Sequence, residues 1–278
     1  AGQVQSEALI EPLMDCLGKR GFRKEARRAL ANYGNLITDR AQNWLNDTTL
    51  SLQVRQEVPR LLRMIGSHEA ADALLKSNPD DDPFLQHRVA MALSRLVHQN
   101  PKVSSHLDQA WIHSAIERQI ERLFRCREDG LLLAPDARFA LLHRAVFSRY
   151  GQILDICLRL FSLQGDRELL NDVSRVLVEG SRAIRGDALE LLDVSLKHHP
   201  LKTALFRELE NVDETILPGR AEGIARRLAA GRDRTLAAVA GRCLGLSGLP
   251  RPTPDPSILP EDLMSDHLID RILLFEKA

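Results

Sequence analysis

Apolar residues recur three and four positions apart along most of the chain, which places them on one side of an α-helix. In the first hundred residues this pattern forms a short helix, a polar turn and a second helix, and the arrangement occurs three times. The three predicted units cover residues 6–34, 35–66 and 67–97. No strand pattern interrupts them, so the expected fold class is all-α.

The second helices of the three units agree in register. Leu30, Leu62 and Leu93 take equivalent positions, 32 and 31 residues apart. Gly34 and Gly66 follow the first two of these helices, where a left-handed cap is favourable. A single helical hairpin cannot bury its apolar face, so neighbouring hairpins must stack and share a core. The sequence therefore predicts a right-handed α-solenoid of stacked antiparallel helix pairs.

The first helix of each unit has its own predicted buried face, defined by the same helical spacing. These faces are Ala8, Leu9, Pro12, Leu13 and Cys16 in the first unit, Ile37, Ala41, Trp44 and Leu45 in the second, and Ala70, Ala71, Leu74 and Leu75 in the third. Pro59 falls inside a predicted second helix and should kink it, because proline lacks the backbone donor that a helix uses.

The repeat becomes irregular after residue 97. Residues 108–129 predict a long amphipathic helix, and residues 134–165 predict either one long helix or two helices meeting near Gly151. The repeat register returns at Arg185, with Ala188 and the pair Leu191-Leu192 in the earlier positions. Residues 1–247 are therefore expected to form one solenoid with longer, irregular helices in its middle.

The end of the chain has a different composition. Residues 248–260 contain five prolines, a density that forbids a helix and predicts a semi-rigid linker. Residues 261–278 predict an amphipathic C-terminal helix. No apolar run approaches the roughly 20 residues that a membrane span requires. We expect a soluble, cytoplasmic chain that does not itself insert into a membrane.

The short helix, the Asp-bearing turn and the Arg-initiated helix together resemble HEAT repeats, an armadillo-like helical family. The residues that carry the resemblance are Asp47 with Arg55, Asp81 or Asp82 with Arg88, and the small-then-large pairs Ala29-Leu30 and Ala92-Leu93. The resemblance implies that the Asp and Arg side chains make structural hydrogen bonds between successive repeats. The first unit departs from the pattern, because Lys19 and Arg20 occupy its turn where the family has Asp.

A second resemblance covers residues 100–278 loosely. The segments "IERLFR" (120–125), "RGDALELLD" (185–193) and "LIDRILLFEKA" (268–278) are similar to the soluble repeat region of bacterial ATP/ADP translocase-like membrane proteins. In that family a membrane half precedes HEAT-like repeats, and some members continue into a cyclic-nucleotide-binding domain. The resemblance implies a cytosolic domain at the inner face of a membrane, tethered to a membrane domain. It transfers no transport or nucleotide-binding residue to this chain, which contains neither of those domains.

The charge of the chain is balanced overall and uneven only locally. The 38 Lys and Arg residues balance the 38 Asp and Glu residues, so no overall field attracts a polyanion. One segment, residues 220–234, contains five arginines and only two acids, Glu222 and Asp233. We take its arginines as candidate partner-binding residues. They are Arg220, Arg226, Arg227, Arg232 and Arg234.

Sequence motifs for catalysis or metal binding are weak. His68, Glu69 and Asp72 imitate a zinc-protease helix but lack its second His, so a solvated helix start explains them better. His198 and His199 are explained by a helix end, where cations are favourable. No Gly-rich phosphate loop occurs. The four cysteines lie far apart and predict reduced thiols: Cys16, Cys126, Cys157 and Cys243.

The expected function is therefore a non-catalytic HEAT-repeat scaffold that binds a protein partner, with no enzymatic activity, no cofactor and no metal. The alternative is a HEAT-like DNA-binding or repair protein with a basic concave face. The neutral total charge and an aromatic content of only 4% argue against that alternative, because bases stack on aromatic side chains.

Overall fold

The protein is described by a computed structural model that covers residues 6–77, 82–134, 136–164, 170, 173, 176–177, 182–210 and 220–246, without the side chains of 182–185 and 210. Within these ranges the chain is helical and contains no strand, which confirms the all-α class. The α-helices are α1 (Ile10–Leu17), α2 (Arg23–Ala31), α3 (Thr38–Asn46), α4 (Leu52–Ile65), α5 (His68–Lys76), α6 (Pro83–Gln99), α7 (Gln109–Leu133), α8 (Ala140–Phe161), α10 (Arg182–Ser195), α11 (Lys202–Glu210), α12 (Ala221–Ala229) and α13 (Arg234–Cys243).

Short polar side chains begin several of these helices. Ser51, Ser67 and Asp82 accept hydrogen bonds from the first free backbone N–H groups of α4, α5 and α6. Asp108 and Asp233 do the same for α7 and α13. Such caps satisfy backbone donors that have no partner inside the helix. They explain why the chain turns where the apolar pattern is interrupted.

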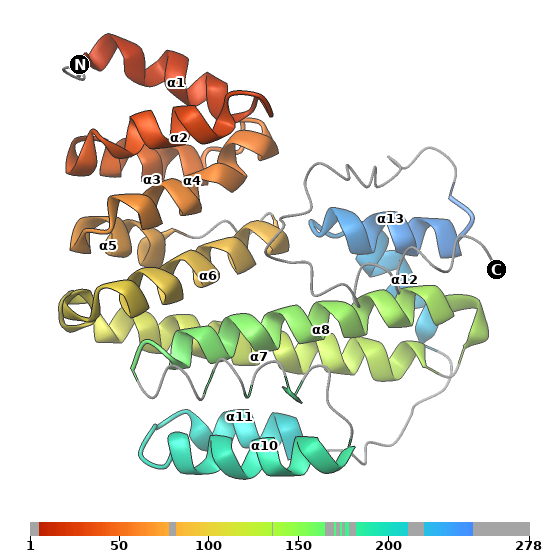
Figure 1. The fold of residues 1–278 in the computed structure, drawn as a ribbon. Coiled ribbons are helices and arrows are strands. Elements are labelled where there is room, and N and C mark those ends of the chain that lie inside the picture. Colours follow the sequence, from red (N-terminus) through yellow and green to blue (C-terminus); the bar gives the residue numbers. More distant parts are fainter. Residues whose placement is uncertain are drawn as a thin grey trace.

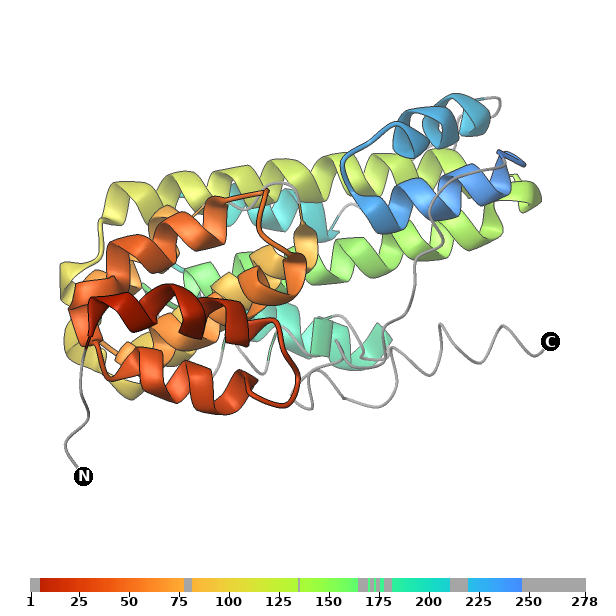
Figure 2. The ribbon, with the colours of Figure 1, turned by 90° about the horizontal axis from the view of Figure 1, so that it is seen from above.

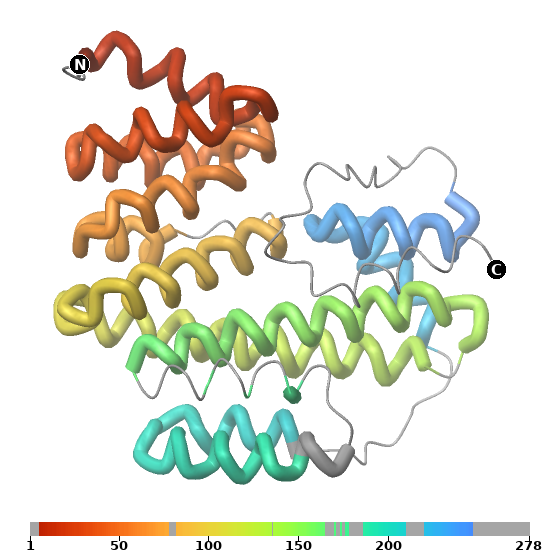
Figure 3. Tube along the Cα trace, in the orientation of Figure 1, coloured from red at the N-terminus to blue at the C-terminus, as the bar shows by residue number. Residues whose placement is uncertain are grey.

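The helices follow one another through space in chain order from α1 to α8 (Figures 1 and 3). Helices α2, α4, α6 and α8 pack side by side in that order, and we refer to these four as the even row. Helices α3, α5 and α7 pack against the row and against their own neighbours. The even row is thus a continuous layer built from helices that are not consecutive in sequence.

The expected core register is confirmed in the second helices. Leu30, Leu62 and Leu93 are fully buried and belong to one hydrophobic core. The predicted faces of α3 and α5 are buried as well. These helices therefore supply apolar surface to their neighbours in the way that the spacing indicates.

The predicted face of the first helix was wrong. Leu9 is 46% exposed, whereas Ile10, Met14 and Leu17 form the buried face of α1. The reason is that Glu7–Leu9 forms a 3-10 turn, which has fewer residues per turn than an α-helix. The α-helical phase therefore begins only at Ile10.

Two long helices dominate the middle of the chain. Helices α7 and α8 pack together along their length, and α8 passes through Gly151 without a break. Figure 2 shows α12 and α13 beside one end of this hairpin. There they form a second hydrophobic core, separate from the one that includes the repeats.

Helix α11 packs on α7, and α10 buries Ala188 and Leu192 but leaves the expected core residue Leu191 exposed.

Two backbone predictions concern α4. The helix continues through Pro59 from Leu52 to Ile65, so the proline does not end it. Gly66 closes the helix with a φ of 74°, and its N–H donates to the carbonyl of Leu62 at 3.2 Å. Gly34 also has a positive φ, of 57°. Both glycines adopt the left-handed conformation that a side chain makes costly.

Arginines near the start of the even-row helices bind neighbouring backbone. Nε of Arg23 and Arg55 donates to the carbonyls of Leu17 and Leu45, at 3.2 and 3.0 Å, near the ends of α1 and α3. Positive charge at a helix C-terminus is favourable. The HEAT-like aspartates act locally instead, because Asp47 binds Thr49 and Asp82 caps its own helix.

A buried ion-pair cluster joins the first two units. Glu57 of α4 accepts from Arg27 of α2, and its other oxygen lies 3.4 Å from Arg23 Nη1. Arg27 and Glu57 side chains are each only 8% exposed. Burial lowers the pKa of Arg27, and Glu57 opposes this effect. Glu57 thus joins the first unit to the second.

The predicted linker at 248–260 and the predicted helix at 261–278 lie outside the described residues. Of the helices that the structure describes, none combines the length and the apolar character needed to span a bilayer.

Replacement of Gly66 by Ala is expected to lower the free energy of unfolding by about 1 kcal/mol, because a Cβ is strained at positive φ. The control is Gly223→Ala inside α12, where an added Cβ meets nothing within 4 Å. That change should raise the free energy by about 0.5–1 kcal/mol through helix propensity. Urea denaturation measures both, and equal effects would contradict the assignment of a left-handed cap.

Replacement of Glu57 by Gln is expected to cost about 3 kcal/mol of stability, because it leaves the buried Arg27 charge without its counter-ion. The matched control is Glu222→Gln, which removes an exposed pair with Arg226 on one helix. Exposed pairs contribute little, so this variant should unfold at nearly the same urea concentration as the wild type. A Glu57→Gln protein as stable as the control would show that the cluster is not a stabilising link.

Candidate functional site

The structure places the five arginines of the predicted basic segment in different environments. Arg226 pairs with Glu222 within α12 at 2.7 Å, and Arg227 reaches Asp129 of α7. Arg220, Arg232 and Arg234 are exposed at the ends of α12 and α13. Two of the five candidate arginines are therefore neutralised by carboxylates. The three others lie beside turns and line no shared concavity that the structure describes.

Asp233, counted as an acid of this segment, serves another purpose. It caps α13, and its oxygens accept from Nε and Nη2 of Arg149 in α8 at 2.7 and 3.1 Å. Arg149 also lies over the ring of Phe84 in α6, 5.0 Å from its centroid. This contact connects α13 to the even row, so Asp233 is a structural residue.

Positive charge is concentrated instead on the even row. Basic residues outnumber acidic ones four against one in α2, three against one in α4, two against none in α6 and three against one in α8. In α1, α3, α5 and α7, acidic residues are in excess by nine against six. A chain with no net charge thus separates its charges between alternate helices, and the row carries the positive part.

Only part of this charge is buried. Arg27, Arg55 and Arg149 are buried and bind Glu57, the Leu45 carbonyl and Asp233. The exposed basic side chains of the row are Lys24, Arg28, Arg60, Arg95 and Arg144. Each of the four helices therefore carries at least one exposed basic side chain.

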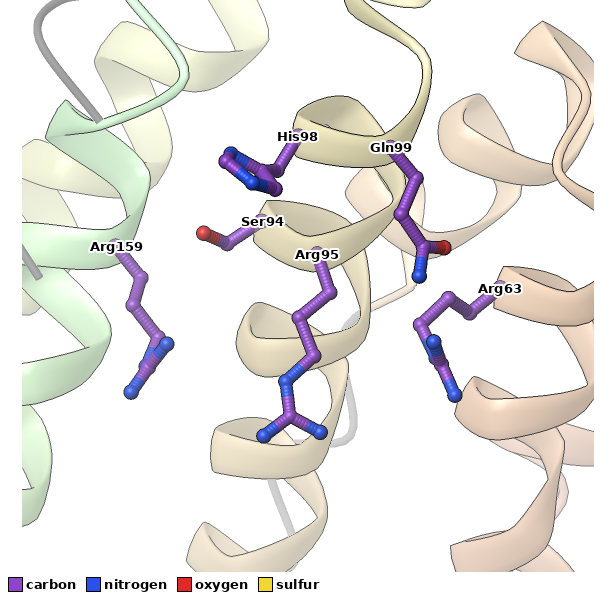
Figure 4. Close-up of a pocket in the computed structure, with 6 residues that line it drawn as sticks. All are labelled: Arg63, Ser94, Arg95, His98, Gln99 and Arg159. Atoms are coloured by element: carbon purple, nitrogen blue, oxygen red, sulfur yellow. The ribbon is translucent and has the colours of Figure 1, made fainter. Parts of the chain in front are cut away.

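A hollow lies on the row between α4, α6 and α8 (Figure 4). We call it the arginine hollow, and it has a volume of about 400 Å³. Its lining residues are Arg63, Ser94, Arg95, His98, Gln99 and Arg159. Each of the three helices contributes one guanidinium group, and none of the six lining residues carries a carboxylate.

Two lining residues of the hollow, Ser94 and Arg159, belong to polar contacts between α6 and α8. Asp155 Oδ2 lies 2.6 Å from Nε2 of buried His87 and accepts from Nε of Arg159 at the same distance. Ser94 and Ser162 hydroxyls are 3.3 Å apart. Burial alone would raise the pKa of Asp155, but the His87 hydrogen bond and the Arg159 guanidinium outweigh it and hold that pKa well below its usual range.

Two of the four cysteines, Cys126 and Cys157, are buried. Burial raises the pKa of Cys126 to about 12, and Cys157 is fully buried with a raised pKa as well. A thiol with so high a pKa carries almost no thiolate at neutral pH and is a poor nucleophile. Among the described residues, no three His, Cys, Asp or Glu side chains are placed to hold a metal ion.

Comparisons of this chain with protein-family models, curated proteins and solved structures found no match.

The arginine hollow was not predicted from sequence. Arg63, Arg95 and Arg159 are spread over nearly a hundred residues, and the predicted candidate segment was chosen by local density alone. A signal was nevertheless present: charges summed over alternate helices separate by sign, whereas charges summed along the chain cancel.

Replacement of Asp155 by Asn is expected to cost about 3 kcal/mol at neutral pH, because Arg159 and His87 lose a buried carboxylate. The folded pKa of Asp155 lies below the unfolded value, so its contribution is present above the unfolded pKa and is lost as pH falls through the folded pKa. The stability difference between wild type and variant should therefore shrink below about pH 4. Urea denaturation at several pH values measures this difference in the free energy of unfolding.

The control is Glu121→Gln, which removes an exposed pair with Arg125. A difference that does not change with pH would contradict the assignment.

Proposed function

We propose that this protein is a non-catalytic, HEAT-like α-solenoid scaffold whose even row binds an acidic protein segment. The observation that carries the proposal is the separation of charge between alternate helices, twelve basic against three acidic residues on the row. Complementary charge steers association and sets the orientation of a partner. An extended acidic segment would meet exposed cations from each of the four helices.

The solenoid part of the proposal is supported by packing between successive helix pairs. Leu30, Leu62 and Leu93 share one core, and each unit contacts the next through the row. Arg88 Nη1 donates to the Gln56 carbonyl at 3.3 Å, a bond between the third unit and the second. The resemblance to HEAT repeats implies such a hydrogen bond, in which an arginine of one repeat binds the preceding repeat.

Nucleic acid is a second candidate partner, favoured by one specific observation. Phe22, Phe84 and Phe147 are 62%, 40% and 40% exposed, and all three lie at the start of, or within, even-row helices. Exposed aromatic rings among cations are the platform on which single-stranded bases stack.

The repair-enzyme form of this alternative has less support. Arg227 and buried Asp129 do pair, but Trp111 is eighteen residues away on the same helix, about 27 Å along its axis. Trp44 is buried in the repeat core on α3. The basic segment, the buried acid and the tryptophans therefore do not gather in one pocket.

Attachment to a translocase-like membrane protein is part of the proposal through sequence likeness only. The encoding open reading frame tests it directly. Membrane-spanning segments upstream of these residues would support the attachment, and a reading frame without them would remove it.

A fluorescent peptide of alternating Glu and Gly is expected to bind at low ionic strength, with an affinity that decreases as salt is added. The double variant Arg28→Glu and Arg60→Glu should weaken binding at least about tenfold, because like charges repel. The matched control, Arg232→Glu and Arg234→Glu, makes the same charge change outside the row and should bind as the wild type does. Fluorescence anisotropy measures all three.

Equal losses in both double variants would show a nonspecific charge effect and overturn the proposal. Binding of a single-stranded oligonucleotide that depends on Arg28, Arg60 and Phe84, without binding of the peptide, would establish the second candidate instead.

A further inference from the structure

The arginine hollow has a composition suited to a particular anion. Figure 4 shows Arg159, Arg95 and Arg63 extending in the same direction from α8, α6 and α4, with Arg95 between the other two. A guanidinium group presents a planar fork of donors that matches the oxygens of carboxylate and phosphate. Three forks from three helices, with the Ser94 hydroxyl and His98 beside them, favour a ligand with several oxygens on one centre.

The charge around the hollow also favours an anion. Asp155 binds Arg159 and lies 2.6 Å from Nε2 of His87, and Glu57 binds Arg23 and Arg27 of α2. Glu25, the third acid of the row, is exposed on α2. The side chains that line the hollow include three guanidinium groups and no carboxylate.

The shape excludes several other ligands. The hollow is open, and all six of its lining side chains are polar or charged. Pockets for apolar small molecules are enclosed and lined mainly by hydrophobic and aromatic side chains. Its volume of about 400 Å³ can accept an anionic group together with the residue that carries it.

We propose that the arginine hollow binds the phosphate monoester of a phosphorylated side chain on the acidic partner, an inference that rests on the proposed function. A phosphate monoester has three terminal oxygens and a charge near −2 at neutral pH, so each guanidinium group can meet one oxygen. A phosphodiester of nucleic acid offers two terminal oxygens and a single charge. Phosphorylation of the partner would then strengthen its binding to the even row.

The test uses two acidic peptides that differ only in one serine or phosphoserine, and isothermal titration calorimetry on the full chain. Phosphorylation is expected to tighten binding of the wild type about tenfold or more, since one charge-assisted hydrogen bond can account for that factor. The double variant Arg63→Gln and Arg95→Gln should bind both peptides with the same affinity.

Two controls separate the hollow from the rest of the row. The double variant Lys24→Gln and Arg28→Gln makes the same charge change on α2. It should weaken the binding of both peptides and leave the ratio of their affinities unchanged. Arg95→Lys keeps the charge but removes the fork, so it should retain the unphosphorylated peptide's affinity and reduce the preference for phosphoserine. This single variant keeps the test decisive even where the double variant at Arg63 and Arg95 does not fold.

The outcomes distinguish the two proposals. Binding of both peptides with equal affinity to the wild type would overturn the phosphate inference and leave the scaffold proposal standing. Inorganic phosphate that raises the melting temperature of the wild type and of Lys24→Gln/Arg28→Gln, but not of Arg95→Lys, would support the hollow even where neither peptide binds and the scaffold proposal fails. Preference for an oligonucleotide over the phosphopeptide, lost in Arg95→Lys, would overturn the phosphoprotein assignment.

Discussion

The structure depends on the burial of Leu and Ala faces between helices that are too short to be stable alone. Helices of eight or nine residues, such as α1, α2, α3 and α5, do not persist in water by themselves, because nucleation is costly and few backbone bonds follow. Packing against the next pair supplies the missing free energy. Since each helix needs neighbours on more than one side, a layer such as the even row has to form, and its outer surface becomes available for recognition.

Electrostatics refines this arrangement rather than creating it. Glu57, Asp155 and Asp233 are the carboxylates that join α2 to α4, α6 to α8 and α8 to α13. Each binds a basic side chain of a neighbouring helix, so these acids connect helices, while five of the row's twelve Lys and Arg side chains are exposed. The positive charge of the row is therefore a consequence of how few acids its helices contain, two of which, Glu57 and Asp155, bind basic side chains inside the fold.

Local physics made much of the fold predictable. The period of Leu30, Leu62 and Leu93, the glycine at position 66 and the long helices of the middle all follow from spacing and caps. The face of α1 did not, because a 3-10 turn at its start changed the helical phase. The arginine hollow and the Glu57 cluster join residues about thirty or more positions apart, and only the packing of α2, α4, α6 and α8 brings them together. The contact of Arg227 with Asp129 was not predictable for the same reason, since Asp129 lies far away in sequence.

The α7–α8 hairpin belongs to both hydrophobic cores, with the repeats at one end and α12 and α13 at the other. Helices α7 and α8 therefore connect the repeats to α12 and α13. Arg159, which lines the arginine hollow, and Arg149, which binds Asp233 at the start of α13, lie ten residues apart on α8. A ligand that moved Arg159 would thus act on the same helix that carries the contact to α13.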